Sequence, residues 1–175
     1  MAILEEAGAE DGEMLICSAL DFADSLSASA VGKPIMLVGK RITEEQLEFI
    51  REAGISKCYM IGGYGAVSAD VENALRETVS SAERVGGDNR YETSYNIALK
   101  FFAGAHDNIV LASGDNFPDG LVGGPLGFNA DGPLLLVNNR NTDLASEYAA
   151  AAGSIECFIL GGNGIISDSN VNKVM

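Results

Sequence analysis

The sequence is poor in several residues on which enzymes and membrane proteins commonly depend. Its 175 residues contain no tryptophan and one histidine, His106. No apolar run approaches the roughly 20 residues that a membrane-spanning helix needs. The HExxH, GxSxG and Walker motifs of zinc proteases, serine hydrolases and nucleotide hydrolases are absent. These absences argue against catalysis, and any carbohydrate binding has to use tyrosine and phenylalanine rings or hydrogen bonds.

Basic residues are also scarce. Lysine and arginine number 11 against 25 aspartates and glutamates, which gives a formal net charge of −14 at pH 7. A chain this acidic is repelled by nucleic acids and by anionic membrane surfaces, so we expect neither as a partner. The acidic first 14 residues lack the basic-then-apolar order of a secretory signal. Any export signal is therefore expected outside this sequence.

Cysteine is rare, and its placement is typical of a structural residue. Cys17, Cys58 and Cys157 each lie in an apolar run, with no CxxC or zinc-finger spacing. We expect them to be small buried hydrophobic residues on strands rather than disulfide partners. The sequence accordingly predicts neither a metal site nor a cofactor.

The sequence contains one pattern twice. The stretch "CSALDFADSLSAS" (Cys17–Ser29) resembles "ASGDNFPDGLVGG" (Ala112–Gly124), at an offset of 95 residues. After a short insertion the offset becomes 99 residues. Pairs that are identical in this second register include Pro34 and Pro133, Cys58 and Cys157, and Gly62 and Gly161. We infer a duplication with one repeat at residues 1–82, truncated at its N-terminus, and another at 83–175, truncated at its C-terminus.

Each copy alternates short apolar runs with segments of helix length. The apolar runs of the first copy are 14–18, 34–38 and 58–62, and 108–113, 133–137 and 157–161 repeat them. Near-continuous apolar strands with helices between them indicate a parallel sheet covered on both faces. Thr43 and Gln46 predict a capping box, and Ser68 predicts a second helix cap. The predicted fold class is α/β, with tandem small Rossmann-like modules of three to four parallel strands each.

The first candidate site follows the first strand of each copy. It contains Asp21 and Asp24 in one copy and Asp115, Asn116 and Asp119 in the other. Ligands of open α/β sheets bind at the carboxyl ends of strands, where these residues are expected. A competing interpretation makes Asp21 and Asn116 helix N-caps, with the later aspartates reaching back to the cap. We favour mainly architectural roles here.

The second candidate site is glycine-rich. "GGYGAVS" (62–68) and "GGNGIIS" (161–167) approach the GxGxxG fingerprint, and Glu83 lies about where a ribose-binding acid belongs. The same glycines are compatible with a tight turn followed by a serine cap, which we favour. A third interpretation is an anion pocket made of backbone N–H groups at a helix start. The glycines concerned are Gly62, Gly63, Gly161 and Gly162.

The third candidate site is "RVGGDNRYETS" (84–94), which combines charges, an aromatic ring and hydroxyl groups at a predicted helix start. Guanidinium groups suit carboxylates and phosphates. An equally strong interpretation is an arginine–carboxylate network that holds the two copies in register. The candidate residues of this site are Arg84, Asp88, Arg90, Tyr91 and Thr93, with Arg41 and Arg140 after nearby strands.

These stretches together resemble the type 2 cell-wall-binding repeat of Gram-positive surface proteins. The resemblance rests on "RVGGDNRYETSYNIA", "IVLASGDNFPDGLVGGPLG", "GPLLLV" and "CFILGGNGIIS". One copy runs from Arg84 to about Asn172, and a degenerate copy precedes it. The earlier copy departs from the family pattern at Ala19, where the family has glycine, and at Ser25, where alanine or glycine is expected.

The resemblance implies a non-catalytic binding module without a cofactor. Such modules occur in tandem, commonly three in a ring, outside the cytoplasm at the cell wall or cell surface. They anchor S-layer proteins or autolysins non-covalently to an anionic cell-wall polysaccharide or teichoic-acid-like polymer. Neighbouring repeats of the chain, or a second chain, are the expected protein partners. The alternative interpretation remains a Rossmann-type nucleotide- or dinucleotide-binding domain or enzyme.

The net charge of −14 should repel a polyanion. Two explanations stay open: local binding through Arg84, Arg90, Arg140 and glycine N–H groups, or cations that bridge aspartates to the polymer.

Overall fold

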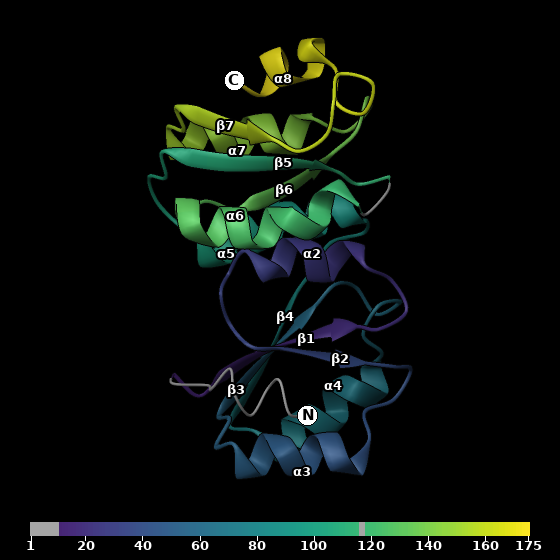
Figure 1. Ribbon diagram of the computed structural model, residues 1–175. Helices are drawn as coiled ribbons and strands as arrows, with labels where there is room; N and C mark the ends of the chain where they lie inside the picture. The colour runs from purple at the N-terminus through teal and green to yellow at the C-terminus, as the bar shows by residue number, and fades with distance from the viewer. Residues whose placement is uncertain (1–10, 116–117) are drawn as a thin grey trace.

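The computed structural model describes residues 11–115 and 118–175, without the side chain of Asp119. The strands in these residues form two parallel sheets (Figure 1). The first sheet has the order β2-β1-β3-β4 and the second the order β6-β5-β7. The strands are β1 (Glu13–Ser18), β2 (Ile35–Val38), β3 (Lys57–Ile61), β4 (Ser81–Val85), β5 (Asn108–Ser113), β6 (Leu134–Val137) and β7 (Glu156–Ile159).

Helices cover both faces of the sheets, as the predicted α/β class requires (Figure 1). Helices α3 and α4 lie on the outer side of the first sheet, and α7 and α8 lie on the outer side of the second. Between the sheets lie α2, α5 and α6. The helices are α2 (Ala23–Ser29), α3 (Glu44–Glu52), α4 (Ala69–Thr78), α5 (Arg90–Phe101), the 3₁₀ turn η1 (Asp119–Val122), α6 (Gly123–Ala130), α7 (Asp143–Ala152) and α8 (Asp168–Val174).

The six apolar runs form strands, as predicted, whereas β4 is a strand that the pattern did not predict. Its sequence, "SAERV", has one buried residue, so it lacks the apolar run that marks the others. The expected division of the chain at residues 82 and 83 falls inside β4 and stays a prediction. The capping box of Thr43 with Gln46 is confirmed, and Ser68 accepts a hydrogen bond from Val71 N at 3.3 Å as the predicted cap.

The cysteines are free, as expected. Cys17 in β1 and Cys58 in β3 are buried, and Cys157 in β7 is half-buried. Burial raises the pKa of the Cys58 thiol to about 12 and that of Cys157 to about 11. These thiols are therefore protonated at neutral pH and serve as apolar packing groups.

Helix α5 belongs to the cores of both sheets. Ile97 packs into the core on the inner face of the first sheet, and Ala98 packs into the core of the second. The Ser94 hydroxyl also accepts a hydrogen bond from Leu136 N in β6, at 3.1 Å. Helix α2 is shared in the same way, with Ala28 in the first core and Leu26 in the second. The two sheets therefore share one inner layer of helices.

Close contact between α2 and α6 depends on glycine. A Cβ added at Gly124 would clash with the Ser29 side chain, and one at Gly127 would lie 3.0 Å from the Ala30 Cβ. A Cβ added at Gly120, in the turn before α6, would likewise come too close to the Leu26 side chain. Larger residues at these positions would push the two helices apart.

We expect Gly124→Ala to lower the melting temperature. Alanine favours a helix by about 1 kcal/mol over glycine, but overpacking of a close contact costs about 1–3 kcal/mol. Thermal unfolding followed by circular dichroism measures the balance.

The matched control is Gly164→Ala, where a Cβ meets nothing within 4 Å. Adding Ser29→Gly to Gly124→Ala should recover part of the loss, because it removes the clashing side chain. Equal stability of Gly124→Ala and wild type would contradict the proposed basis of the α2–α6 contact.

Candidate functional site

A cavity of about 380 Å³ lies at the carboxyl ends of β1 and β3, where the strand order of the first sheet reverses. This is the usual place for a ligand in an open α/β sheet. We call it the Asp24 cavity. Its lining residues are Asp21, Ala23, Asp24, Gly63, Gly65, Ala66, Gly87, Asp88, Asn89, Arg90, Tyr91 and Thr93.

Asp24 lies against the glycine-rich loop instead of capping its own helix. Helix α2 begins at Ala23 with no side-chain cap at Phe22, and Asp21 Oδ1 accepts a hydrogen bond from Ala23 N at 3.2 Å. A Cβ at Gly62 would clash with the Asp24 carboxylate, and this glycine has a φ of +100°. Burial raises the pKa of Asp24, and repulsion from Asp21 adds to the rise. Of the two aspartates, only Asp21 contacts the start of the helix. It does so from the residue before the N-cap position, which Phe22 occupies.

Arg90 joins the two halves of the chain at this cavity. Its Nη1 donates to the Gly114 carbonyl at 2.6 Å, and its Nη2 donates to Asp21 Oδ2 at 3.2 Å. Gly114 follows β5 of the second sheet, and Asp21 follows β1 of the first. Both terminal nitrogens of Arg90 are therefore engaged in holding the loops together.

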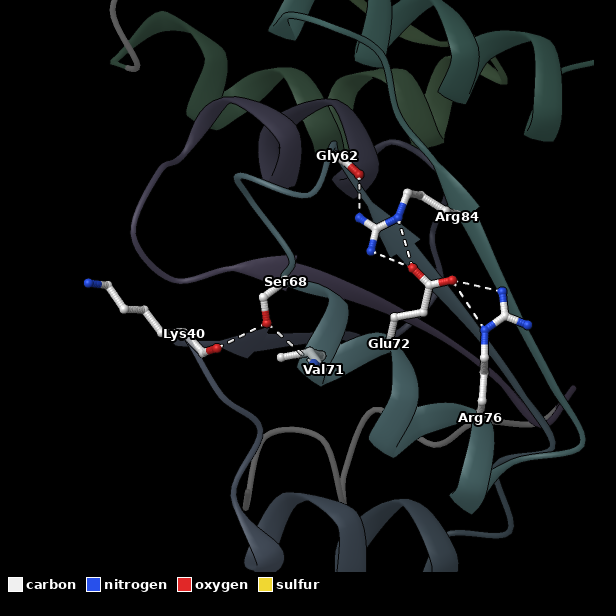
Figure 2. A network of polar contacts seen from close by, with 7 residues as sticks. All are labelled: Lys40, Gly62, Ser68, Val71, Glu72, Arg76 and Arg84. Carbon is white, nitrogen blue, oxygen red and sulfur yellow. Dashed lines mark hydrogen bonds and ion pairs between the residues drawn. The ribbon is translucent and has the colours of Figure 1, made fainter.

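Arg84 binds the start of the glycine-rich loop that lines this cavity, and Figure 2 shows it between Gly62 and Glu72. Its Nη1 donates to the Gly62 carbonyl at 2.9 Å, and its Nη2 donates to Glu72 Oε2 at 2.8 Å. The guanidinium also lies over the Tyr64 ring, 4.1 Å from its centroid. Hydrogen bonds from Arg76 and from Arg84 lower the pKa of Glu72. This network fixes the carbonyl of the positive-φ glycine and so positions the loop that lines the cavity.

We expect Glu72→Gln to destabilise the protein by about 3 kcal/mol at pH 7, because it leaves a largely buried arginine without its counter-charge. The folded-state pKa of Glu72 lies below the ordinary 4.5, so its stabilising effect is full above about pH 4.5. The effect is lost as the pH falls through the folded-state pKa. Melting temperatures should therefore differ at pH 7 and converge in acid.

Glu77→Gln is the control on the same helix, because Glu77 is exposed and forms no ion pair with a described residue. A difference between Glu72→Gln and wild type that persists unchanged in acid would argue against this network.

A second cavity, of about 270 Å³, lies beside α7. We call it the Arg140 cavity. Its lining residues are Asn89, Tyr91, Glu92, Leu136, Arg140, Asn141, Asp143, Leu144 and Ala145. Asn89 and Tyr91 line both cavities, so both hollows border the start of α5. Asn89 caps that helix, since its Oδ1 accepts hydrogen bonds from Tyr91 N at 3.0 Å and Glu92 N at 3.1 Å.

Tyr91 is held in place between the cavities. Its hydroxyl donates to Asp115 Oδ1 at 2.9 Å and accepts from Asn138 Nδ2 at 2.5 Å. The ring lies so close to Gly114 that a Cβ there would clash with it. Burial, followed by the hydrogen bond to Asp115, raises the pKa of Tyr91 to about 12. Hydrogen bonds from Asn138 and from Tyr91 lower the pKa of Asp115.

Tyr91→Phe should raise the pKa of the Asp115 carboxyl group, because the carboxylate loses one of its donors. The titration is followed by NMR of the carboxyl carbon. Tyr95→Phe is the matched control, since the Tyr95 hydroxyl donates to Glu147 at 2.6 Å and does not contact Asp115. An Asp115 pKa that is the same in Tyr91→Phe and wild type would refute the assigned hydrogen bond.

The remaining candidate residues are more dispersed. Asp88 is exposed at the rim of the Asp24 cavity, and buried Thr93 accepts a hydrogen bond from Gly87 N at 3.2 Å. Arg41 is exposed and lines neither cavity. Gly161 and Gly162, which follow β7, are exposed, and neither lines these cavities. Asn116 and the side chain of Asp119 lie outside the described residues.

Three features of the site were not predicted or differ from expectation. Asn89 is followed three residues later by Glu92, a helix-start signal that the sequence does show. No such signal marks Asn138 in the sequence. Its counterpart in the first copy is Gly39, so comparison of the copies does not single it out. Glu83, at the position of a ribose-binding acid, pairs instead with Lys57 at 3.4 Å and Lys100 at 2.6 Å.

Comparison with known proteins decides the family. Residues 1–72 and 84–171 match the family described as Cell wall binding domain 2 (CWB2). The chain belongs to this family. It is thus a cell wall binding module, and the resemblance found in its motifs is confirmed. Within residues 11–115 and 118–175, no helix has the length and apolar character to cross a bilayer.

Two curated relatives illustrate the spread of the family. The uncharacterized protein PH0614 of Pyrococcus horikoshii is 32% identical over 122 residues, which cover 67% of this chain and 37% of that protein. The N-acetylmuramoyl-L-alanine amidase LytC of Bacillus subtilis is 24% identical over 166 residues, which cover 91% of this chain and 33% of LytC. The chain therefore spans about a third of the length of these relatives.

Solved structures share the fold. Cwp6 from Clostridium difficile matches with a TM-score of 0.83 and 20% identity over 95% of this chain and 28% of Cwp6. Cwp8 from the same organism matches with a TM-score of 0.77 and 20% identity over 93% of this chain and 29% of Cwp8.

Proposed function

We propose that this module anchors an extracellular surface protein, such as an S-layer protein or an autolysin, to an anionic polymer of the cell wall. The anchoring is non-covalent, and the module itself catalyses no reaction. The observation that carries the proposal is the pair of cavities that share Asn89 and Tyr91, one of them lined by residues from both halves of the chain. Family membership supplies the class of ligand, a cell-wall polymer.

The lining groups suit a sugar polymer. Carboxylates, amide groups and backbone carbonyls accept hydrogen bonds from sugar hydroxyls, and Arg140 can pair with an acidic substituent. Tyr91 gives the cavities an aromatic wall in a chain that has no tryptophan.

The one histidine in the sequence, His106, lines neither cavity. It precedes β5, at the opposite end of that strand, and its Nδ1 lies 3.0 Å from the Asp131 carbonyl.

The amidase activity in the name of LytC concerns a protein about three times as long as the matched segment. Attachment and catalysis are then tasks of different parts of such proteins. We accordingly propose that this module supplies attachment, while the protein to which it is joined supplies any activity.

Sedimentation with purified cell walls tests the proposal. Walls of Clostridium difficile and Bacillus subtilis are suitable, since structural neighbours and LytC come from these organisms. We expect the protein to sediment with walls of at least one of them and to stay in solution after the anionic polymers have been stripped chemically. Retention that survives stripping, or no retention on either wall, would refute the proposal.

The nucleotide-binding alternative predicts a different result. A ligand that binds the folded state raises the melting temperature, so NAD should stabilise the protein if that alternative holds. Under the proposed function, NAD leaves the melting temperature unchanged.

A further inference from the structure

We propose that the two cavities are adjacent subsites for one glycan chain, and that they take units of unlike charge. The Arg140 cavity takes a unit with an acidic group, and the Asp24 cavity takes the neutral, hydroxyl-rich unit next to it. This inference rests on the proposed function and specifies the ligand of that site.

The Asp24 cavity is unsuited to an anion. Its lining includes three carboxylates, of Asp21, Asp24 and Asp88. Its one basic side chain, Arg90, already uses Nη1 for the Gly114 carbonyl and Nη2 for Asp21. A sugar hydroxyl would instead find hydrogen-bond acceptors there, without the repulsion that an acidic group would meet.

The Arg140 cavity has a cation that forms no ion pair within the described part of the chain, which the other cavity lacks. Among the described residues, the Arg140 guanidinium has no hydrogen-bond or ion-pair partner, and its positive charge contributes to lowering the pKa of Asp115. Its backbone is fixed, since Arg140 N donates to Asn138 Oδ1 at 2.9 Å. Two carboxylates, of Glu92 and Asp143, also line this cavity. Glu92 accepts a hydrogen bond from Asp88 N at 2.9 Å, and Asp143 lies in the first turn of α7, where the helix dipole offsets its charge. An acidic group on the ligand is the natural partner for this arginine.

The cavities have the size and the proximity that adjacent subsites need. Their volumes, about 270 and 380 Å³, lie near the lower end of the range of about 300–1,000 Å³ for small-ligand sites. We therefore assign one unit of the glycan to each. Asn89 and Tyr91 are shared by the two linings, and Tyr91 is braced by Asp115 and Asn138. A chain that passes over Tyr91 can occupy both cavities at once.

The arrangement explains how a protein with a net charge of −14 binds an anionic polymer. A polymer with a charge on every unit would place an anion among the carboxylates of the Asp24 cavity. A polymer with neutral units between its charges avoids that contact. Binding is then local, through one arginine, and depends only modestly on salt.

Arg140→Gln tests the anionic subsite, with Arg41→Gln as its matched control. Arg41 is the counterpart of Arg140 in the earlier copy, is also exposed and lines neither cavity. Sedimentation is measured on the wall preparation that retains the wild type, at low and at high sodium chloride. We expect Arg140→Gln to weaken retention about tenfold or more and to abolish its salt dependence. Arg41→Gln should match the wild type.

Gly65→Leu tests the neutral subsite, with Gly164→Leu as its matched control. Gly65 lines the Asp24 cavity and a Cβ there meets nothing within 4 Å, so a leucine adds apolar bulk to the lining without strain. Gly164 is its counterpart in the second unit, with equally open surroundings, and it lines neither subsite. We expect Gly65→Leu to weaken retention while the salt dependence stays that of the wild type. Unchanged melting temperatures show that all four variants are folded.

The outcomes separate the two proposals. If the wild type fails to sediment with either wall, the proposed function fails, and the subsites fail with it. If the wild type sediments but each variant behaves like its matched control, the subsites are refuted while the proposed function stands. A salt dependence altered by Gly65→Leu and preserved in Arg140→Gln would refute the assignment of charge to the two cavities.

Discussion

The helix layer between the two sheets is the constraint on which the rest of the molecule depends. Helices α2 and α5 each contribute to the core of both sheets, so neither half of the chain buries its inner face by itself. Glycines of α6 allow α2 to approach closely, and this fixes the distance between the halves. The start of α5 then lies between loops of both units, where Asn89 and Tyr91 line two cavities. The geometry of the site is therefore a consequence of the shared core.

Two of the arginines in the candidate site serve this architecture. Arg90 links a loop of the first sheet to Gly114 of the second, and Arg84 holds the Gly62 loop. The donors that these arginines use inside the protein, Nη1 and Nη2 in each case, are not available to a polymer in the same orientation. The scarcity of basic residues therefore makes the guanidinium of Arg140, which no described side chain pairs with, more informative than the overall charge.

The sequence predicted the features that depend on local pattern. The apolar runs predicted strands, and Thr43 with Gln46 predicted the start of a helix. The repeated glycines predicted turns with positive φ, which Gly62 and Gly161 have. Strand β4 escaped prediction because its side chains are mostly polar. The partners of Asp24 escaped for another reason: contacts between residues distant in sequence, such as Asp24 with the Gly62 loop, leave no periodic trace. The sequence pattern thus indicated which loops line the site. The fold was needed to show which of their side chains have partners among the described residues.

Duplication also explains why the two halves are not equivalent. Arg41 and Arg140 occupy matching positions, yet the residue two places earlier is Gly39 in one copy and Asn138 in the other. The Asn138 side chain fixes the backbone of its own loop and also reaches Tyr91, which Gly39 has no side chain to do. Three of the four residues at 138–141 differ from their counterparts at 39–42, and only the arginine of the later copy lines one of the two cavities. The sites of a repeat protein have to be assigned copy by copy, because the same motif residue acquires its role from neighbours that the duplication did not preserve.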